Sequence, residues 1–161
     1  MRYTTIDSPV GELLASADAA GRITGLHFHD GHRLPARDSS WARDEEALAP
    51  LRRQLEQYFV GERHEFDLDL APSGTPFQLS VWRELQAIPY GETASYGEIA
   101  AAVGQPGAAR AVGGANNRNP IAIVIPCHRV IGANGTLTGY GGGLPRKQQL
   151  LALETGVLAL A

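Results

Sequence analysis

The stretch Ala71-Pro72-Ser73-Gly74-Thr75-Pro76 divides the chain into two parts with different patterns. Prolines and glycine at this density are typical of a turn or linker between packed units. Strand patterns precede the stretch and helical patterns follow it. The 161 residues, 43% of them hydrophobic, suffice for a substantial core. We therefore predict two domains, residues 1–75 and residues 76–161.

Before this linker, the pattern predicts a small sheet with one helix packed on it. Residues 2–6, 12–17 and 22–29 are rich in strand-forming residues and are separated by turn signals. Residues 45–59 then carry apolar side chains at helical spacing. Residues 66–70 alternate between apolar and polar types, which predicts one further strand.

After the linker, the pattern is mainly helical. We predict helices over residues 77–87, 99–103, 108–116 and 144–153. Ser95 and Glu98 form a capping box before the second of these, and residues 104–107 join it to the third. The joined pair predicts a helix-turn-helix. The fold class is therefore α+β, with a small N-terminal sheet domain and a helical, winged-helix-like C-terminal domain.

Charge and composition narrow the class of protein. The net charge is −3, but residues 1–75 hold 8 Arg and 13 Asp or Glu, whereas residues 76–161 hold 6 Lys or Arg and 4 Asp or Glu. The second half could therefore face phosphates while the first faces solvent. No apolar run is long enough for a membrane span, and the N-terminus lacks the apolar stretch of a signal peptide. We expect a cytoplasmic protein.

The histidines give little support for a metal site. His27 and His29 would share one face of a strand, but His32 falls in a predicted loop and nothing supplies further strong ligands. We expect ordinary strand and loop histidines and no metal. His64, beside Glu65, is expected at the surface.

Cys127 is the only cysteine, so it can form neither an internal disulfide nor a cysteine-rich zinc site. It follows the apolar run of residues 121–125 and Pro126, where a buried strand would deliver a side chain to the edge of a pocket. His128 and Arg129 beside it would favour the thiolate. Adjacent side chains on extended chain point to opposite faces, so His128 would act through a turn or a water. Glu154 is a candidate to orient His128.

These residues also resemble a known family. Residues 125–130, Ile-Pro-Cys-His-Arg-Val, look like the active-site sequence of the O6-alkylguanine-DNA alkyltransferases. Residues 89–98, 108–113, 119–120 and 138–144 resemble the same family, so the motifs cover residues 75–155 densely. The N-terminal half fits only as a similar small sheet domain.

The resemblance implies roles for individual residues. Cys127 would accept the alkyl group, His128 would be its base through a water, and Glu154 would orient His128. Asn119 would tie the recognition helix to the active-site strand, and the Tyr96 hydroxyl would lie near guanine N3. The substrate site would use the carbonyls of Cys127 and Val130 for the guanine amino group, the backbone of Gly141 and Gly142 near O6, and Tyr140 as a wall.

The resemblance also implies contacts with DNA. Arg110 would fill the space left by an extruded base, in a minor-groove mode. Other DNA contacts would come from Tyr96, Thr93, Ser95, Ala109, Ala111 and Gly113. The partner would be double-stranded DNA carrying O6-alkylguanine, with O4-alkylthymine and clustering on DNA left open. No cofactor and no membrane are implied, and a monomer is expected.

Two other classes of protein remain open on the residues alone. A helix-turn-helix with a fixed thiol could be a transcription factor or a non-catalytic sensor of damage. Cys127, His128 and Glu154 could also serve a cysteine hydrolase, although such enzymes usually recruit the histidine from far away in sequence. A structural cysteine is the commonest fate of a lone buried thiol.

Overall fold

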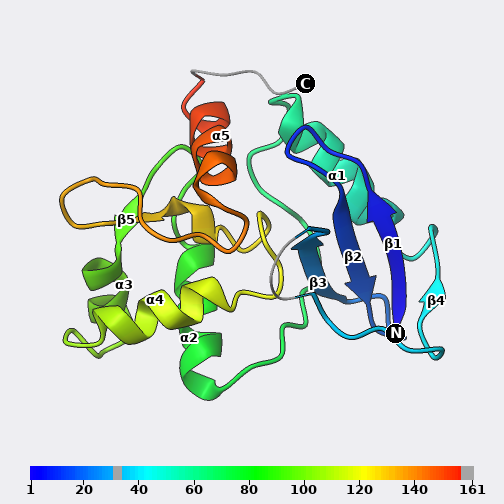
Figure 1. Ribbon diagram of the computed structural model, residues 1–161, viewed down its shortest axis with the longest axis horizontal. Helices are drawn as coiled ribbons and strands as arrows, with labels where there is room; N and C mark the ends of the chain where they lie inside the picture. Colours follow the sequence, from blue (N-terminus) through cyan, green and yellow to red (C-terminus); the bar gives the residue numbers. More distant parts are fainter. Residues whose placement is uncertain (31–33, 157–161) are drawn as a thin grey trace.

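The computed structural model describes residues 1–30 and 34–156, so His32 lies outside the described residues. Figure 1 shows a sheet with one helix on one side of the molecule and a group of helices on the other. The α+β prediction is confirmed, with the sheet formed by the first part of the chain and the helices α2 to α5 by the second.

The sheet has four strands in the order β3-β2-β1-β4. Strands β1 (Arg2–Ile6), β2 (Leu13–Ala17) and β3 (Ile23–Phe28) are antiparallel neighbours, as the turn signals predicted. The two-residue strand β4 (Ala42–Arg43) runs parallel to β1 and was not predicted. Every residue of β2 is buried, because both faces of the central strand are covered.

Helix α1 (Ala49–Phe59) begins four residues later than predicted. Pro50 stands in its first turn, where the fixed φ of proline and its missing N–H fit a helix start. Leu51, Leu55 and Tyr58 are buried along one side of α1. This apolar side packs into the core that joins the two parts of the chain.

The helical part contains α2 (Pro76–Gln86), α3 (Tyr96–Ala102), α4 (Ala109–Asn117) and α5 (Leu144–Glu154). Capping boxes open α2, with Thr75 and Gln78, and α3, with Ser95 and Glu98. Gly104, at φ +80°, follows the end of α3 and lets the chain turn towards α4. A parallel pair of two-residue strands, β5 (Ala94–Ser95) and β6 (Val130–Ile131), joins the start of α3 to the segment after Cys127.

The strand predicted over residues 121–125 is wrong. Ile121 makes a single bridge to Leu26, and the chain then turns, with the N–H of Ile125 donating to the carbonyl of Ile121 at 3.0 Å. Ile123 adopts φ 71°, a left-handed conformation that is rare for a β-branched residue. All five residues are buried. A tightly packed turn and a buried strand therefore have the same apolar composition, which explains the error.

The strand predicted over residues 66–70 is also wrong. Only Leu70 pairs, through one parallel bridge to Ile23. At Asp67, a side chain takes the place of a neighbouring strand: the amide of Gln54 donates to the carbonyl of Asp67 and accepts from its N–H.

The two parts of the chain meet along the edge of β3. The N–H of Leu26 donates to the carbonyl of Pro120 at 2.9 Å, and the N–H of Ala122 donates to the carbonyl of Leu26 at 3.0 Å. The sheet therefore holds the turn that leads to Cys127.

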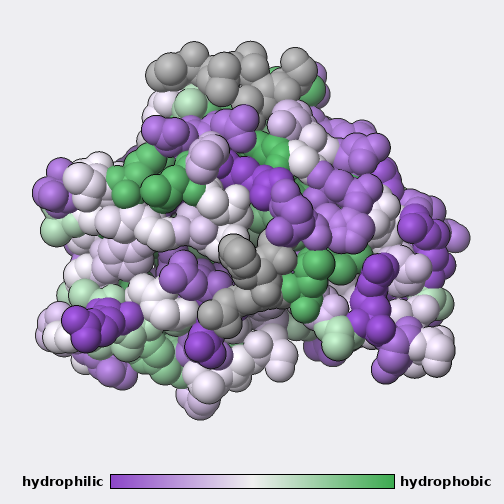
Figure 2. Space-filling view, viewed as in Figure 1, coloured by the Kyte–Doolittle hydropathy of each residue, from purple (hydrophilic) through white to green (hydrophobic). Residues whose placement is uncertain are grey.

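On the face shown in Figure 2, hydrophobic side chains form small groups that are separated by hydrophilic ones. Large hydrophobic residues with substantial exposure are Met1, Leu34, Val60 and Leu144. Within residues 1–30 and 34–156, no helix has the length and apolar character that crossing a bilayer requires.

Candidate active site around Cys127

A turn of 3₁₀ helix, η1 (Cys127–Arg129), replaces the strand end that was expected to carry Cys127. Pro126 precedes it, and the N–H of Arg129 donates to the Pro126 carbonyl at 3.0 Å. Successive side chains on such a helix point about a third of a turn apart. The turn therefore sends Cys127 and His128 in different directions from adjacent positions.

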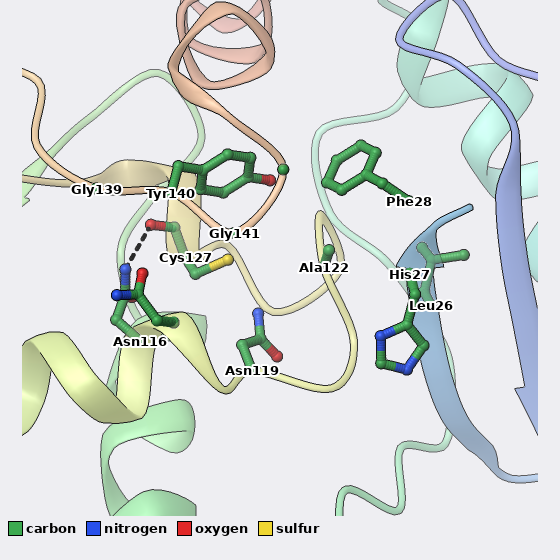
Figure 3. Close-up of a pocket in the computed structure, with 12 residues that line it drawn as sticks. Leu26, His27, Phe28, Asn116, Asn119, Ala122, Cys127, Gly139, Tyr140 and Gly141 are labelled. Atoms are coloured by element: carbon green, nitrogen blue, oxygen red, sulfur yellow. Dashed lines mark hydrogen bonds between the residues drawn. The ribbon is translucent and has the colours of Figure 1, made fainter. Parts of the chain in front are cut away.

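Cys127 lies at a cavity of about 410 Å³ between the helical part and β3. Its sulfur points into this space in Figure 3, with Tyr140 and Asn119 on either side. The cavity is lined by Leu26, His27, Phe28, Asn116, Asn117, Asn119, Ala122, Cys127, Gly139, Tyr140, Gly141 and Gly142. A small organic group could thus reach the thiol, although Cys127 itself is only 5% exposed.

Glu154, at the end of α5, accepts hydrogen bonds from several buried donors. Its Oε2 accepts from His128 Nε2 at 2.6 Å, from the Tyr58 hydroxyl at 2.6 Å and from Arg129 Nη2 at 3.0 Å. Its Oε1 accepts from Arg129 Nε at 2.8 Å. Burial raises the pKa of Glu154, but the hydrogen bond from His128 and the hydrogen bonds and charge of Arg129 outweigh it and hold the pKa of the carboxyl well below its usual range. Glu154 is therefore ionised.

This contact fixes the tautomer of His128. A carboxylate can only accept, so neutral His128 carries its proton on Nε2 and presents a lone pair at Nδ1. Nδ1 is buried and has no hydrogen-bond partner among the described residues. Burial lowers the pKa of His128, and Glu154 opposes that shift. A neutral imidazole with a free basic nitrogen suits a base that takes a proton through a bridging water.

The thiol itself is poorly ionised in this structure. Burial raises the pKa of Cys127, while the amide of Asn119 and the charge of Lys147 offset part of that shift. Burial also raises the pKa of Tyr140, and the neighbouring thiol adds to this effect. Removal of the thiol proton thus has to be coupled to a base.

Lys147 contributes a buried positive charge that was not predicted from the sequence. Its Nζ donates to the carbonyl of Val130 at 2.5 Å and to that of Thr138 at 2.8 Å. It therefore holds the segment after Cys127 against the loop of residues 138–143. Lys147 is the only lysine in a chain with 13 arginines, which is a signal that could have drawn attention to it.

Asn119 and the glycine-rich loop shape the cavity. The amide of Asn119 donates to the Ile125 carbonyl at 2.7 Å and accepts from the N–H of Ile121 at 3.0 Å, so it closes the turn before Cys127. At Gly142, a Cβ atom would lie 2.5 Å from the ring of Phe28 and 2.9 Å from that of Tyr140. Glycine at this position allows the loop to approach β3.

The residues assigned to DNA lie on α3, α4 and the segment before them. Arg110 and Ala111 are exposed on α4, Ala109 and Gly113 are half-buried, and Thr93 is exposed. The Ser95 side chain is used as the cap of α3. The Tyr96 hydroxyl accepts a hydrogen bond from the Thr138 hydroxyl at 3.0 Å. Tyr96 is not one of the residues that line the cavity.

Several residues of the site were missed because only the folded chain brings them together. Tyr58 comes from α1 in the sheet part. Arg129 was expected to favour the thiolate, but its contacts are with Glu154 and with the carbonyl of Ile88, which lies 2.7 Å from its Nη1. Asn116 lies against the carbonyl of Cys127. The sequence spacing alone contained no signal for the contacts of Tyr58 or Asn116.

The histidines of β3 take separate roles. His29 Nδ1 pairs with Glu12, whereas His27 lines the cavity. Within the part of the chain that the structure describes, no cluster of three or more potential metal ligands occurs. His64 is exposed, as predicted, and its ring stacks on that of Tyr90, with ring centroids 3.8 Å apart.

Comparison with known proteins adds the family. Residues 76–156 match the family described as "6-O-methylguanine DNA methyltransferase, DNA binding domain", and residues 1–72 match the one described as "6-O-methylguanine DNA methyltransferase, ribonuclease-like domain". A curated methylated-DNA–protein-cysteine methyltransferase of Mycolicibacterium paratuberculosis is 58% identical over 96% of this chain and 92% of its own length. One of the same name from Methanosarcina acetivorans is 54% identical over 96% of this chain and 98% of its own.

A solved structure agrees with the sequence relatives. The crystal structure of Mycobacterium tuberculosis OGT in complex with DNA superposes with a TM-score of 0.90 at 52% identity, covering 98% of this chain and 94% of that one. The similarity includes both the sheet part and the helical part that together surround Cys127. The chain belongs to the O6-methylguanine DNA methyltransferase family.

Proposed function

We propose that this protein repairs DNA by direct reversal, taking an alkyl group from O6 of guanine onto Cys127 once per molecule. The observation that supports this best is the thiol at the cavity beside a buried His128–Glu154 pair whose basic nitrogen has no partner among the described residues. The related proteins named as methylated-DNA–protein-cysteine methyltransferases support the same activity.

The proposed reaction is a single displacement at carbon. The thiol proton passes through a water to Nδ1 of His128, while Glu154 stabilises the imidazolium that forms. The thiolate attacks the alkyl carbon, an S–C bond forms, and the C–O6 bond breaks with its electron pair leaving on guanine. The guanine anion then takes a proton from water while His128 returns the thiol proton to water, and the Tyr96 hydroxyl is the proposed stabiliser of the guanine charge. The product is a thioether, which water does not readily hydrolyse, so turnover stops at one.

Reaction at O6 requires that the nucleotide leave the base stack. We assign DNA binding to the α3–α4 pair as a helix-turn-helix that enters the minor groove. Helix α4 carries small residues, and a Cβ atom at Gly114 would meet open space, which suits close approach to a narrow groove. Arg110, exposed near the start of α4, is the proposed filler of the vacated stack.

The remaining functional assignments follow from this activity. Residues 1–75 and 76–161 are proposed as the two domains, with the second carrying the DNA contacts. A protein that repairs the chromosome of a prokaryote would reside in the cytoplasm at the nucleoid, and it would act as a monomer. The thiolate supplies the electron pair for the displacement, so the reaction needs no cofactor.

Mass spectrometry after incubation with O6-methylguanine DNA tests the proposal. We expect a permanent gain of one methyl group on Cys127, and Cys127→Ser should bind DNA without gaining it, because an alcohol is hardly ionised near neutral pH. Many turnovers without an adduct would indicate a cysteine hydrolase. Binding without adduct or turnover would indicate a damage sensor, and either result would overturn the proposed function.

A further inference from the structure

Arg146, the third residue of α5, joins that helix to the sheet part and to the loop before the helix. Its Nε donates to the carbonyl of Val10, a buried residue, at 2.7 Å, and its Nη1 donates to the carbonyl of Gly142 at 3.2 Å. Nη1 and Nη2 also donate to the two carboxylate oxygens of Asp30, at 2.8 and 3.1 Å. A guanidinium group is planar and rigid, so these four hydrogen bonds together fix its position.

The backbone of the sheet part leaves room for this side chain. Gly11 has φ +110°, and a Cβ atom there would lie 2.8 Å from Nη2 of Arg146. Glycine therefore permits both the backbone conformation and the close approach of the guanidinium. The side chain of Asp30 is 71% exposed, so the ion pair alone contributes little to stability. The contacts with backbone carbonyls are what distinguish Arg146 from an ordinary surface arginine.

The same guanidinium lies against the wall of the cavity that holds Cys127. Its central carbon is 4.7 Å from the ring centroid of Phe28. The rings of Phe28 and Tyr140 meet edge to face, with centroids 6.0 Å apart. In Figure 3, the hydroxyl end of Tyr140 points towards Phe28, above the sulfur of Cys127. Arg146 thus supports, through one intervening ring, a residue that lies beside the thiol.

The loop that carries Tyr140 is held at both ends by neighbouring residues of α5. Lys147 Nζ donates to the carbonyl of Thr138 at 2.8 Å, and Arg146 donates to that of Gly142. Tyr140 lies between these two attachment points. The position of its ring relative to the thiol therefore depends on Arg146 as well as on Lys147.

We propose that Arg146 is a positioning residue that keeps the cavity small and so limits the size of the alkyl group that Cys127 accepts. This inference rests on the proposed function. A methyl group needs the least room beside the thiol, whereas a longer alkyl chain presses on the ring of Tyr140 once the base occupies the cavity. Without Arg146, Gly142 and Phe28 each lose a support, so the ring yields at a lower cost.

The size of the effect follows from the cost of forcing extra carbon atoms into a fixed site. That cost corresponds to a rate ratio of about 5- to 150-fold. The matched substrates are O6-methylguanine and O6-butylguanine, placed at the same position of the same duplex, so that a change in DNA binding or base extrusion affects both rates alike. The two alkyl groups differ in intrinsic reactivity, but this difference is the same for every protein and cancels when ratios are compared.

The experiment measures single-turnover rates on the two duplexes and compares the ratio of methyl to butyl transfer among proteins. We expect Arg146→Met, which keeps a long unbranched side chain, to lower this ratio by at least about 5-fold relative to the wild type. Arg146→Lys should lower it as well, because an ammonium group can pair with Asp30 but lacks the fork that reaches both carbonyls. Arg53→Met, at an exposed arginine on α1, is the control and should keep the wild-type ratio.

Gly11→Ala reaches the same contact from the sheet part and leaves Arg146 in the chain. Its added methyl group would meet Nη2 and displace the guanidinium, so the ratio should fall here too. Because the substitution is outside the cavity lining, the test does not depend on how Arg146→Met folds.

Each outcome bears on a separate claim. If Arg146→Met, or Gly11→Ala in its place, slows both duplexes by the same factor, Arg146 only supports the fold and its role in alkyl size is overturned. A wild-type ratio in Arg146→Lys also overturns that role, because charge alone would then suffice, and so does a ratio that Arg53→Met lowers equally. If the wild type gains neither alkyl group, the proposed function fails instead.

Discussion

At the scale of single residues, the charge on Glu154 sets the basicity of His128. The two side chains are both buried and lie 2.6 Å apart, whereas the thiol is reached only through a proposed water. In Glu154→Gln, His128 loses the negative charge that favours its protonated form, so its pKa falls further and the apparent pKa of Cys127 rises. Iodoacetamide labelling measured against pH would report this shift.

The matched control for that variant is Glu92→Gln, an exposed carboxyl in the loop before β5. Its labelling profile should coincide with that of the wild type. A thiol whose profile moves to lower pH in Glu154→Gln would show that direct repulsion between the Glu154 carboxylate and the thiolate outweighs the effect through His128, and the proposed proton path would be abandoned.

Single residues also show how far the sequence could lead. Cys127 and His128 belong to one sequence motif, and Glu154 is the last residue of α5. The family resemblance pointed to all three together. Asn116 and Tyr58 carry no unusual local pattern, because an amide and a tyrosine are ordinary on helices, and Lys147 stands out only as the single lysine of the sequence. Their importance comes from contacts between positions 11 to 96 residues apart. Spacing within one element cannot predict such contacts.

At the scale of elements, helix positions were predicted better than the active-site segment. The capping boxes and the apolar spacing of α2 and α3 are local signals, and local hydrogen bonds form those elements. The turn of residues 121–126 depends instead on Asn119 and on the edge of β3. Its apolar composition satisfies a strand equally well, so periodicity alone could not separate the two.

Helix α4 allows base extrusion to be separated from chemistry. Arg110 is exposed and does not line the cavity, so it should stabilise an extruded nucleotide without contacting the reacting carbon. Arg110→Ala should slow repair of duplex DNA by about 10-fold or more, since extrusion costs a few kcal/mol. Reaction with free O6-benzylguanine, which needs no extrusion, should change little. Comparison of the two rates in the same preparation is the measurement.

A control for the loss of charge is Arg83→Ala, an exposed arginine on α2. It should leave both rates near those of the wild type. If Arg110→Ala slowed duplex DNA and free O6-benzylguanine by the same factor, Arg110 would be supporting the cavity, and its assignment to the DNA stack would be dropped.

At the scale of the whole molecule, stability should fall in acid because three wholly or partly buried groups have lowered pKa values. Burial lowers the pKa of His128, so below about pH 6.5 the unfolded chain binds a proton that the folded protein does not. His27 shifts in the same direction by burial. Below about pH 4.3, the unfolded chain also protonates Glu154, which stays ionised when folded. Each difference favours the unfolded state.

Urea unfolding between pH 4 and pH 7.5 would measure this dependence. The free energy of unfolding should decline from about pH 6.5 downwards and more steeply below about pH 4.5. His128→Asn should weaken the first decline, because that variant has no imidazole to protonate at this position. A free energy that stays level from pH 7 to pH 5 in the wild type would mean that His128 is not held neutral.

The sheet part and the helical part are also joined through the active site itself. Tyr58 lies on α1 and is fully buried, and its hydroxyl donates at 2.6 Å to the same Glu154 oxygen that His128 contacts. Arg146 of α5 makes a second connection, with Nε 2.7 Å from the carbonyl of Val10 and Nη1 2.8 Å from Asp30. The N-terminal part is therefore connected to the carboxylate that contacts the proposed base, His128.

Tyr58→Phe tests this connection, because it removes one oxygen and preserves the ring contacts with Phe59, Phe66 and Tyr90. Loss of a hydrogen bond to a buried charge should lower the free energy of unfolding by about 1.5–3 kcal/mol. With one donor fewer, the Glu154 carboxylate attracts the His128 proton more strongly, so the apparent pKa of Cys127 should fall. Tyr3→Phe, on β1, is the control and should change neither quantity, because Tyr3 is not among the donors to Glu154. If Tyr58→Phe left both the unfolding energy and the labelling profile unchanged, the sheet part would be only a scaffold for the turn before Cys127, without influence on its proton transfer.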